Sequence, residues 1–156
     1  MYTYVIIDDE PLIRRGTKKK LEPLSHLLTC CGEASDGREG LELVRQLKPD
    51  IVILDMQMPV MAGTELLPAL SEEFPSTALI VISGFQNFDY MKQAISSKVI
   101  DYILKPFSKD EIQQTVLKTI DSLKDKEAED HHLTSMVQEK EEAFYSLDLK
   151  LLTDFL

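Results

Sequence analysis

Four apolar stretches of this chain each end in polar side chains that could take part in chemistry. Asp8 and Asp9 follow the run "VII", and Asp55 ends "IVILD". Ser83 ends "LIVIS", and Lys105 ends "YILK". In an open parallel sheet the ligand site lies beyond the carboxyl ends of the strands. We therefore expect three acids, one hydroxyl and one amine to meet at one edge of a sheet.

This combination of side chains indicates phosphoryl chemistry. Clustered carboxylates repel one another and raise each other's pKa values unless a cation lies between them. Oxygen ligands alone suit a hard ion such as Mg²⁺. Lys105 and Ser83 could hold the oxygens of a phosphoryl group. Asp55 could be the nucleophile that forms an aspartyl phosphate.

Each of these residues, taken alone, has a plainer explanation. The acids of "DDE" could lie in a solvated turn or cap a helix, and Asp55 could cap a strand end. Ser83 could be a turn residue before Gly84, and Lys105 could lie on the surface. Their joint occurrence, in order and each at the end of an apolar run, favours the functional interpretation.

The stretches between these residues predict an α/β domain, because five apolar runs alternate with five helical patterns. The expected strands are Thr3–Asp8, Leu27–Ser35, Asp50–Asp55, Thr77–Ser83 and Val99–Lys105. The expected helices are Pro11–Glu22, Gly37–Lys48, Ala62–Phe74, Asn87–Lys98 and Ser108–Leu123. Runs such as "IVIL" are apolar on both faces, as parallel strands covered on both sides should be. Ser108 and Glu111 form the pattern of a capping box at the start of the last helix.

The bulk properties limit the function further. The chain has 156 residues, enough for one domain with an appendage. Its 17 basic against 27 acidic residues give a formal net charge of -10, which disfavours direct binding to nucleic acids or anionic membranes. The two cysteines, Cys30 and Cys31, are adjacent and form neither a disulfide framework nor a metal-binding spacing. With no signal-peptide pattern and no membrane-length apolar run, a cytoplasmic location is expected.

Four segments together resemble the receiver domain of two-component response regulators. They are "VIIDDEPLIRRG", "PDIVILDMQMPVMAGTELL", "VISGFQNFDYMKQAI" and "DYILKPFSKDEI". The resemblance implies a receiver domain over residues 1–123, with a doubly wound, flavodoxin-like parallel sheet of strand order 2-1-3-4-5 and helices on both faces. The third segment is most similar to the subgroup whose output domain is an AraC-type helix-turn-helix module.

The resemblance also implies a role for each site residue. Asp55 matches the residue that accepts a phosphoryl group from a sensor histidine kinase. Asp9, Asp55 and the backbone carbonyl of Gln57 match the Mg²⁺ ligands, and Asp8 matches an acid that acts through water. The implied function is a phosphorylation-controlled switch that acts on a transcriptional output domain.

Further positions match the moving parts of such a switch. Ser83 and Lys105 match the hydroxyl and the amine that bind the phosphoryl group, and Tyr102 matches the aromatic switch residue. The Lys105–Pro106 peptide bond is expected to be cis. Phe85, two residues after Ser83, is expected to flank the path of attacking water.

Two positions depart from the family pattern. Ala62 stands before Gly63 where aspartate is usual, so the helix that begins there should lack a side-chain cap. Lys98 stands where glycine usually precedes the fifth strand. A glycine there suits a left-handed helix end, and Lys98 must either adopt that conformation or alter the loop.

Two other functions are less well supported by the sequence. A phosphohydrolase with an aspartate nucleophile usually needs a second acid two residues later as general acid or base, and this chain has Gln57 there. The chain is therefore not expected to be an enzyme with turnover beyond its own phosphorylation and slow dephosphorylation. A receiver that works without phosphorylation is disfavoured because every residue of the site is present.

Residues 124–156 are expected to form a helical linker or extension, with the output domain absent from this chain. The segment has apolar residues at roughly helical spacing, namely Leu133, Met136, Val137, Phe144, Leu147, Leu151 and Phe155. We predict that this extension pairs with its copy in a homodimer. The alternatives are that it folds back on its own receiver domain, or that it stays disordered without a partner domain.

Overall fold

The structure is a computed structural model that describes the backbone of residues 1–136 and the side chains of residues 1–128. The strands are β1 (Tyr2–Ile7), β2 (Leu28–Ala34), β3 (Ile51–Asp55), β4 (Ala78–Ser83) and β5 (Asp101–Leu104). The helices are α1 (Pro11–Leu21), α2 (Gly37–Leu47), α3 (Gly63–Glu73), α4 (Phe88–Ser96) and α5 (Lys109–Met136). A short 3₁₀ turn, η1 (Glu22–Leu24), follows α1.

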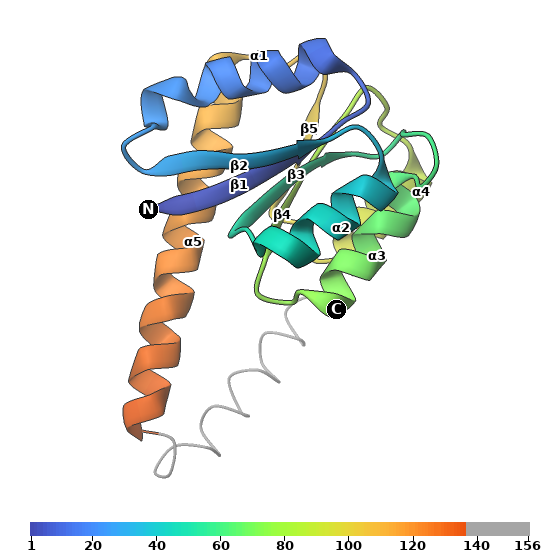
Figure 1. Ribbon diagram of the computed structural model, residues 1–156. Helices are drawn as coiled ribbons and strands as arrows, with labels where there is room; N and C mark the ends of the chain where they lie inside the picture. The colour runs from blue at the N-terminus through green and yellow to red at the C-terminus, as the bar shows by residue number, and fades with distance from the viewer. Residues whose placement is uncertain (137–156) are drawn as a thin grey trace. The chain divides into compact units, whose positions relative to one another are not determined.

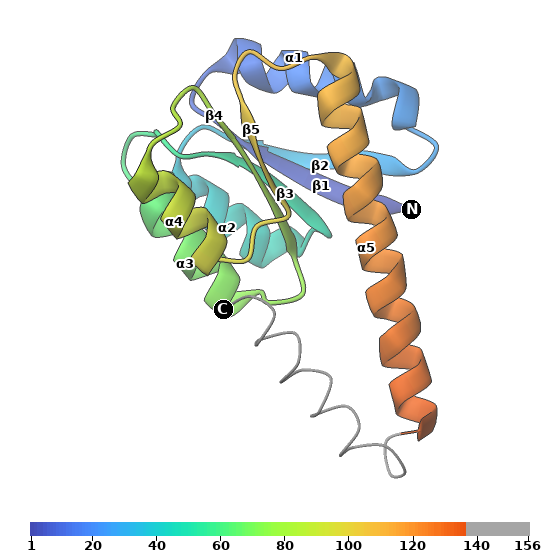
Figure 2. The ribbon, with the colours of Figure 1, turned by 180° about the vertical axis from the view of Figure 1, so that it is seen from behind.

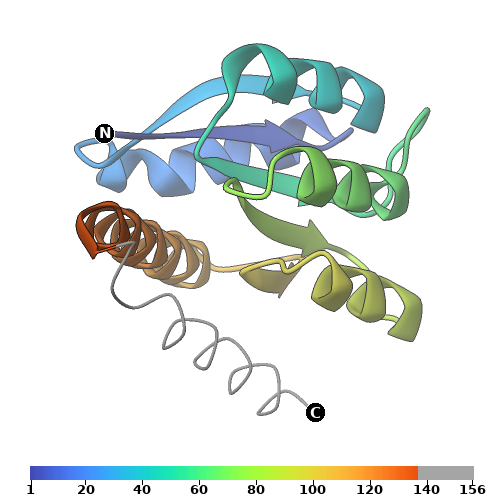
Figure 3. The same ribbon diagram turned by 90° about the horizontal axis from the view of Figure 1, so that it is seen from below.

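All five strands are parallel and lie in the order β2-β1-β3-β4-β5, which confirms the predicted doubly wound topology (Figure 1). Helix α1 and the beginning of α5 cover one face of the sheet, and α2, α3 and α4 cover the other (Figure 3). Helices α1 and α5 are joined directly, since Gln113 Nε2 donates a hydrogen bond to the carbonyl of Lys20 at 2.8 Å.

The core follows from the apolar runs seen in the sequence. Every residue of β3 and β4 is buried, including the polar ends Asp55 and Ser83. Strand β2 is an edge strand with mixed burial, which explains its weaker sequence pattern. Its register with β1 shifts at Tyr4, where Cys31 is the extra residue of a bulge. Cys30 and Cys31 are half-buried free thiols, and burial raises the pKa of each.

Short polar residues begin several of the helices. Asp36, Asn87 and Ser108 accept hydrogen bonds from backbone amides in the first turns of α2, α4 and α5, at 2.8, 2.8 and 3.1 Å. Ala62 begins α3 without a side-chain cap, as its departure from the family pattern predicts. The next residue is glycine because a Cβ at position 63 would lie 2.5 Å from the carbonyl oxygen of Asp55.

One expected backbone feature is confirmed, and the choice left open at Lys98 is decided. Lys98 has a left-handed backbone with φ of 57°, and the Lys105–Pro106 bond is cis. Lys48 at the end of α2 and Val60 in the β3–α3 loop also have positive φ, at 46° and 68°. Val60 is β-branched, and such a residue rarely adopts this conformation.

The chain divides into two units, with the boundary after Ile120 inside α5. The first unit holds the sheet and the buried core. In the second unit, residues 121–136 are helical, and the predicted apolar positions from Val137 to Phe155 lie outside the described residues. Over residues 1–136, none of the helices combines the length and apolar character that a membrane span requires.

Candidate functional site

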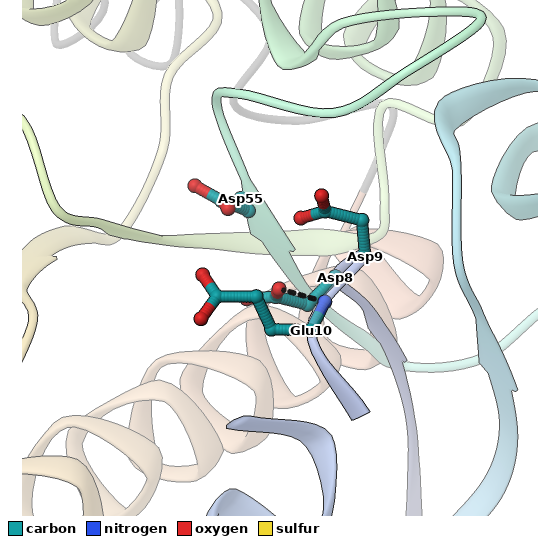
Figure 4. A group of neighbouring side chains, drawn as sticks. All are labelled: Asp8, Asp9, Glu10 and Asp55. Carbon is teal, nitrogen blue, oxygen red and sulfur yellow. Dashed lines mark hydrogen bonds between the residues drawn. The ribbon is translucent and has the colours of Figure 1, made fainter. Parts of the chain in front are cut away.

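The predicted acids meet at the carboxyl edge of the sheet. Asp8 and Asp9 directly follow β1, and Asp55 ends β3, its neighbour in the sheet. Figure 2 shows this edge from behind, and Figure 4 shows the carboxylates of Asp9, Glu10 and Asp55 around a shared space. One carboxylate oxygen from each of these residues and from Asp8 lies within 4.8 Å of the others. Glu10 was not predicted as part of the site.

Lys105, just after β5, connects three of these acids. Its Nζ lies 2.8 Å from Asp8 Oδ2, 3.1 Å from Asp55 Oδ2 and 3.3 Å from Glu10 Oε1. The contacts with Asp55 and Glu10 are also hydrogen bonds, whereas the contact with Asp8 is an ion pair without hydrogen-bond geometry. The Lys105 side chain is only 11% exposed and those of Asp8 and Asp55 are buried, so these three charges interact with little solvent screening.

The charges of this cluster do not balance. When all are ionised, the four carboxylates and the one ammonium sum to a net charge of -3, from four negative charges less one positive charge. Burial raises the pKa of Asp8 and of Asp55, and Lys105 only partly opposes that rise. Burial alone would lower the pKa of Lys105, but Asp8 and Asp55 outweigh it and raise this pKa. The site therefore keeps its ammonium protonated and still has an excess of negative charge.

Asp55 is held in a defined orientation by its own turn. Its Oδ1 accepts hydrogen bonds from the backbone amides of Met56 at 2.7 Å and Gln57 at 3.4 Å. Its Oδ2 accepts from Lys105. The Asp55 residue is 4% exposed, and its carboxylate lines the cleft beside Gln57, Met58 and Phe85. This arrangement suits a positioned nucleophile that meets its substrate through the cleft.

Ser83 and Tyr102 are joined through one residue of the β4–α4 loop. Ser83 is fully buried, and its Oγ accepts a hydrogen bond from the backbone amide of Phe85 at 3.2 Å. The hydroxyl of Tyr102 donates to the carbonyl oxygen of the same Phe85. Burial raises the pKa of Tyr102, which keeps this hydroxyl protonated. The two predicted switch residues therefore both contact Phe85, in the loop next to the acid cluster.

The side chain of Gln57 is connected to α4. Its Nε2 donates a hydrogen bond to the hydroxyl of Tyr90 at 3.0 Å. Tyr90 was not predicted as part of the site, because its partner lies 33 residues away in the sequence. The site thus includes side chains beyond the predicted set, among them Glu10, Met58 and Tyr90.

Fold and site together define a class of protein. The chain is an open, doubly wound α/β domain with an oxygen-rich, negatively charged site beyond the carboxyl ends of β1 and β3. This is the switch point at which strand order reverses, where such sheets bind their ligands. The chain belongs to the response regulator receiver domain family, whose sequence model matches residues 4–117.

Relatives with known names are response regulators. A response regulatory protein of Staphylococcus epidermidis is 39% identical over 106 residues, which are 68% of this chain and 41% of the relative. The transcriptional regulatory protein YesN of Bacillus subtilis is 37% identical over 124 residues, 80% of this chain and 34% of the relative. The chain therefore spans about two fifths or less of the length of these relatives.

Solved receiver domains share the fold. The receiver domain of AraT, a response regulator from Geobacillus stearothermophilus, is 32% identical with a TM-score of 0.75. The similarity covers 81% of this chain and 98% of that one. The receiver domain of the response regulator NarL from Mycobacterium tuberculosis is also 32% identical, with a TM-score of 0.69, over 79% of this chain and 96% of that one.

Proposed function

We propose that this chain is a phosphorylation-controlled receiver that accepts a phosphoryl group on Asp55 from a sensor histidine kinase. The observation that carries this proposal is the orientation of the Asp55 carboxylate. Two backbone amides hold one of its oxygens, and Lys105 Nζ lies 3.1 Å from the other. A kinase partner agrees with membership of the receiver family.

The residues present fit a bound Mg²⁺. The excess of negative charge and the purely oxygen ligands match the preference of a small, hard cation. Asp9, Asp55 and the backbone carbonyl of Gln57 would hold the ion, with Asp8 acting through water. When bound, Mg²⁺ would neutralise charge on the carboxylates and on the phosphoryl oxygens.

The transfer step uses Asp55 as the nucleophile. A carboxylate oxygen of Asp55 attacks phosphorus, and the bond from phosphorus to the donor breaks, which is a P–N bond in phosphohistidine. The donor leaves as imidazole after taking up a proton, and Asp55 becomes an acyl phosphate. The Lys105 ammonium remains charged and pairs with an oxygen of the transferred group.

The response of the domain would begin at Ser83. If its hydroxyl turns to the phosphoryl group, it loses the hydrogen bond that it accepts from the backbone amide of Phe85. The Phe85 carbonyl is bonded to Tyr102, so the movement would reach β5 through this tyrosine. The contacts through Phe85 support Ser83 and Tyr102 as a coupled pair.

The output of the switch would be transcription. The names of relatives such as YesN and HptR of Staphylococcus aureus support this, and both relatives are longer than this chain. The segment "SGFQNFDYMKQAI" and the similarity to AraT favour an AraC-type output domain. We propose a cytoplasmic protein that turns over no substrate and, with a net charge of -10, leaves DNA binding to the output domain.

Acetyl phosphate with Mg²⁺ tests the proposal without the kinase. Intact-mass spectrometry should show one added phosphoryl group per chain, and Asp55→Asn or EDTA should abolish it. Asp36→Asn is the matched control, because asparagine caps α2 as well as aspartate does. Undiminished labelling of the Asp55→Asn variant at another residue would contradict the assignment of Asp55.

A further inference from the structure

Two contacts hold Tyr90 in place, one through its backbone and one through its ring. It is the third residue of α4, and its backbone amide donates to the Asn87 cap at 2.8 Å. Its partly buried ring packs against the core cluster of the domain. Contacts other than the one with Gln57 therefore hold its backbone and its ring.

Gln57 is anchored at its backbone and at its side-chain end. Its backbone amide donates to Asp55 Oδ1 at 3.4 Å, and Gln57 lines the same cleft as Asp55. One of its two amide protons is engaged by the Tyr90 hydroxyl at 3.0 Å. A side chain that is two residues from Asp55 and would otherwise rotate freely is thus tied to α4.

We propose that Tyr90 is a positioning residue that prolongs the phosphorylated state by holding the Gln57 amide away from an attacking water. The inference rests on phosphorylation of Asp55, as proposed above. A residue of α4 would then affect the lifetime of the phosphoryl group through the hydrogen bond between Gln57 and Tyr90.

The chemistry concerned is hydrolysis of the acyl phosphate. A water oxygen attacks phosphorus, the bond from phosphorus to the Asp55 oxygen breaks, and Asp55 returns to a carboxylate. The product is inorganic phosphate, which keeps one proton of the water while the other goes to solvent. A free Gln57 amide can accept a hydrogen bond from the water with its Oε1 and orient it toward phosphorus. To do so the Gln57 side chain must rotate, and its hydrogen bond to the Tyr90 hydroxyl opposes this rotation.

Four forms of the full chain test this coupling: the natural chain, Tyr90→Phe, Gln57→Met and the double variant. Tyr90→Phe keeps the ring that packs on the core and removes only the hydroxyl. Methionine at 57 keeps the length of the side chain and removes the amide. Each protein is phosphorylated with acetyl phosphate and Mg²⁺, the donor is removed, and the decay of the phosphoryl label on Asp55 is followed by mass spectrometry.

Tyr90→Phe should shorten the phosphoryl half-life by about two- to tenfold, the range expected for loss of one hydrogen bond. In the Gln57→Met background the same change should have no effect. An unchanged or longer half-life in Tyr90→Phe, or equal shortening in both backgrounds, would overturn the positioning role. If the natural chain takes up no label on Asp55, the proposed function itself fails, and that outcome is seen before any variant is compared.

Discussion

Replacing Lys98 by glycine should stabilise the domain, because Lys98 holds a backbone conformation that suits glycine. With φ of 57°, it is the first residue beyond the Ser97 cap of α4. The amide of Lys98 donates to the carbonyl of Ile95 at 3.1 Å, and that of Val99 donates to Ala94 at 3.2 Å. These two bonds form a Schellman motif, whose left-handed position is usually glycine.

The expected gain follows from two opposing effects. A left-handed backbone costs a residue with a Cβ about 1–2 kcal/mol. Glycine offsets about 0.4–1 kcal/mol of this, because it makes the unfolded chain more flexible. The net gain at Lys98 is therefore about 1 kcal/mol. For a chain of this length it corresponds to a rise of about 3–4 °C in Tm.

Urea unfolding followed by circular dichroism measures this gain as a higher midpoint at an unchanged m-value. Two variants serve as controls. Lys98→Ala removes the exposed side chain but keeps the Cβ, so its midpoint should barely change. Lys92→Gly places glycine at an exposed position inside α4 and should destabilise by about 1 kcal/mol. A midpoint that is equal or lower in Lys98→Gly would refute the reasoning.

Three further predictions concern the site and the C-terminal segment. Asp8→Asn should raise the urea midpoint measured in EDTA at neutral pH, because burial raises the pKa of Asp8 and the folded state opposes its ionisation. A lower midpoint would mean that the ion pair with Lys105 outweighs burial. Phe85→Ala should shorten the phosphoryl half-life, since Phe85 lines the cleft over Asp55; decay no faster than in the natural chain would exclude a shielding role. The full chain should sediment as a dimer at micromolar concentration and a chain truncated after Leu123 should be more monomeric; equal masses would show that residues 124–156 do not drive association.

The strand-end residues could be predicted because the signal is local. A parallel strand covered on both faces is apolar throughout, so an acid that ends the run marks the edge of the sheet. Asp55 and Ser83 are buried at those ends, as this logic requires. At Lys98 the local pattern at the end of a helix left two outcomes open, and the structure shows the left-handed one.

Glu10 and Tyr90 could not be predicted from such patterns. Glu10 precedes α1 and is 58% exposed at its side chain, and its contact with Lys105 spans 95 residues of sequence. Tyr90 has the sequence context of an ordinary amphipathic helix residue. Its bond to Gln57 depends on how α4 packs beside the β3–α3 loop, which is a tertiary property with no short-range signal.

The net charge of the cluster explains why phosphorylation should require a divalent cation. A phosphoryl group brings further negative charge toward carboxylates that, when all are ionised, already exceed the single ammonium by three charges. Lys105 cannot offset this alone, because its Nζ is already shared among Asp8, Asp55 and Glu10. A divalent cation on Asp9 and Asp55 would reduce the excess to one negative charge and would free Lys105 to pair with the phosphoryl oxygens. We therefore expect the binding of Mg²⁺ and the binding of a phosphoryl group at this cluster to favour each other.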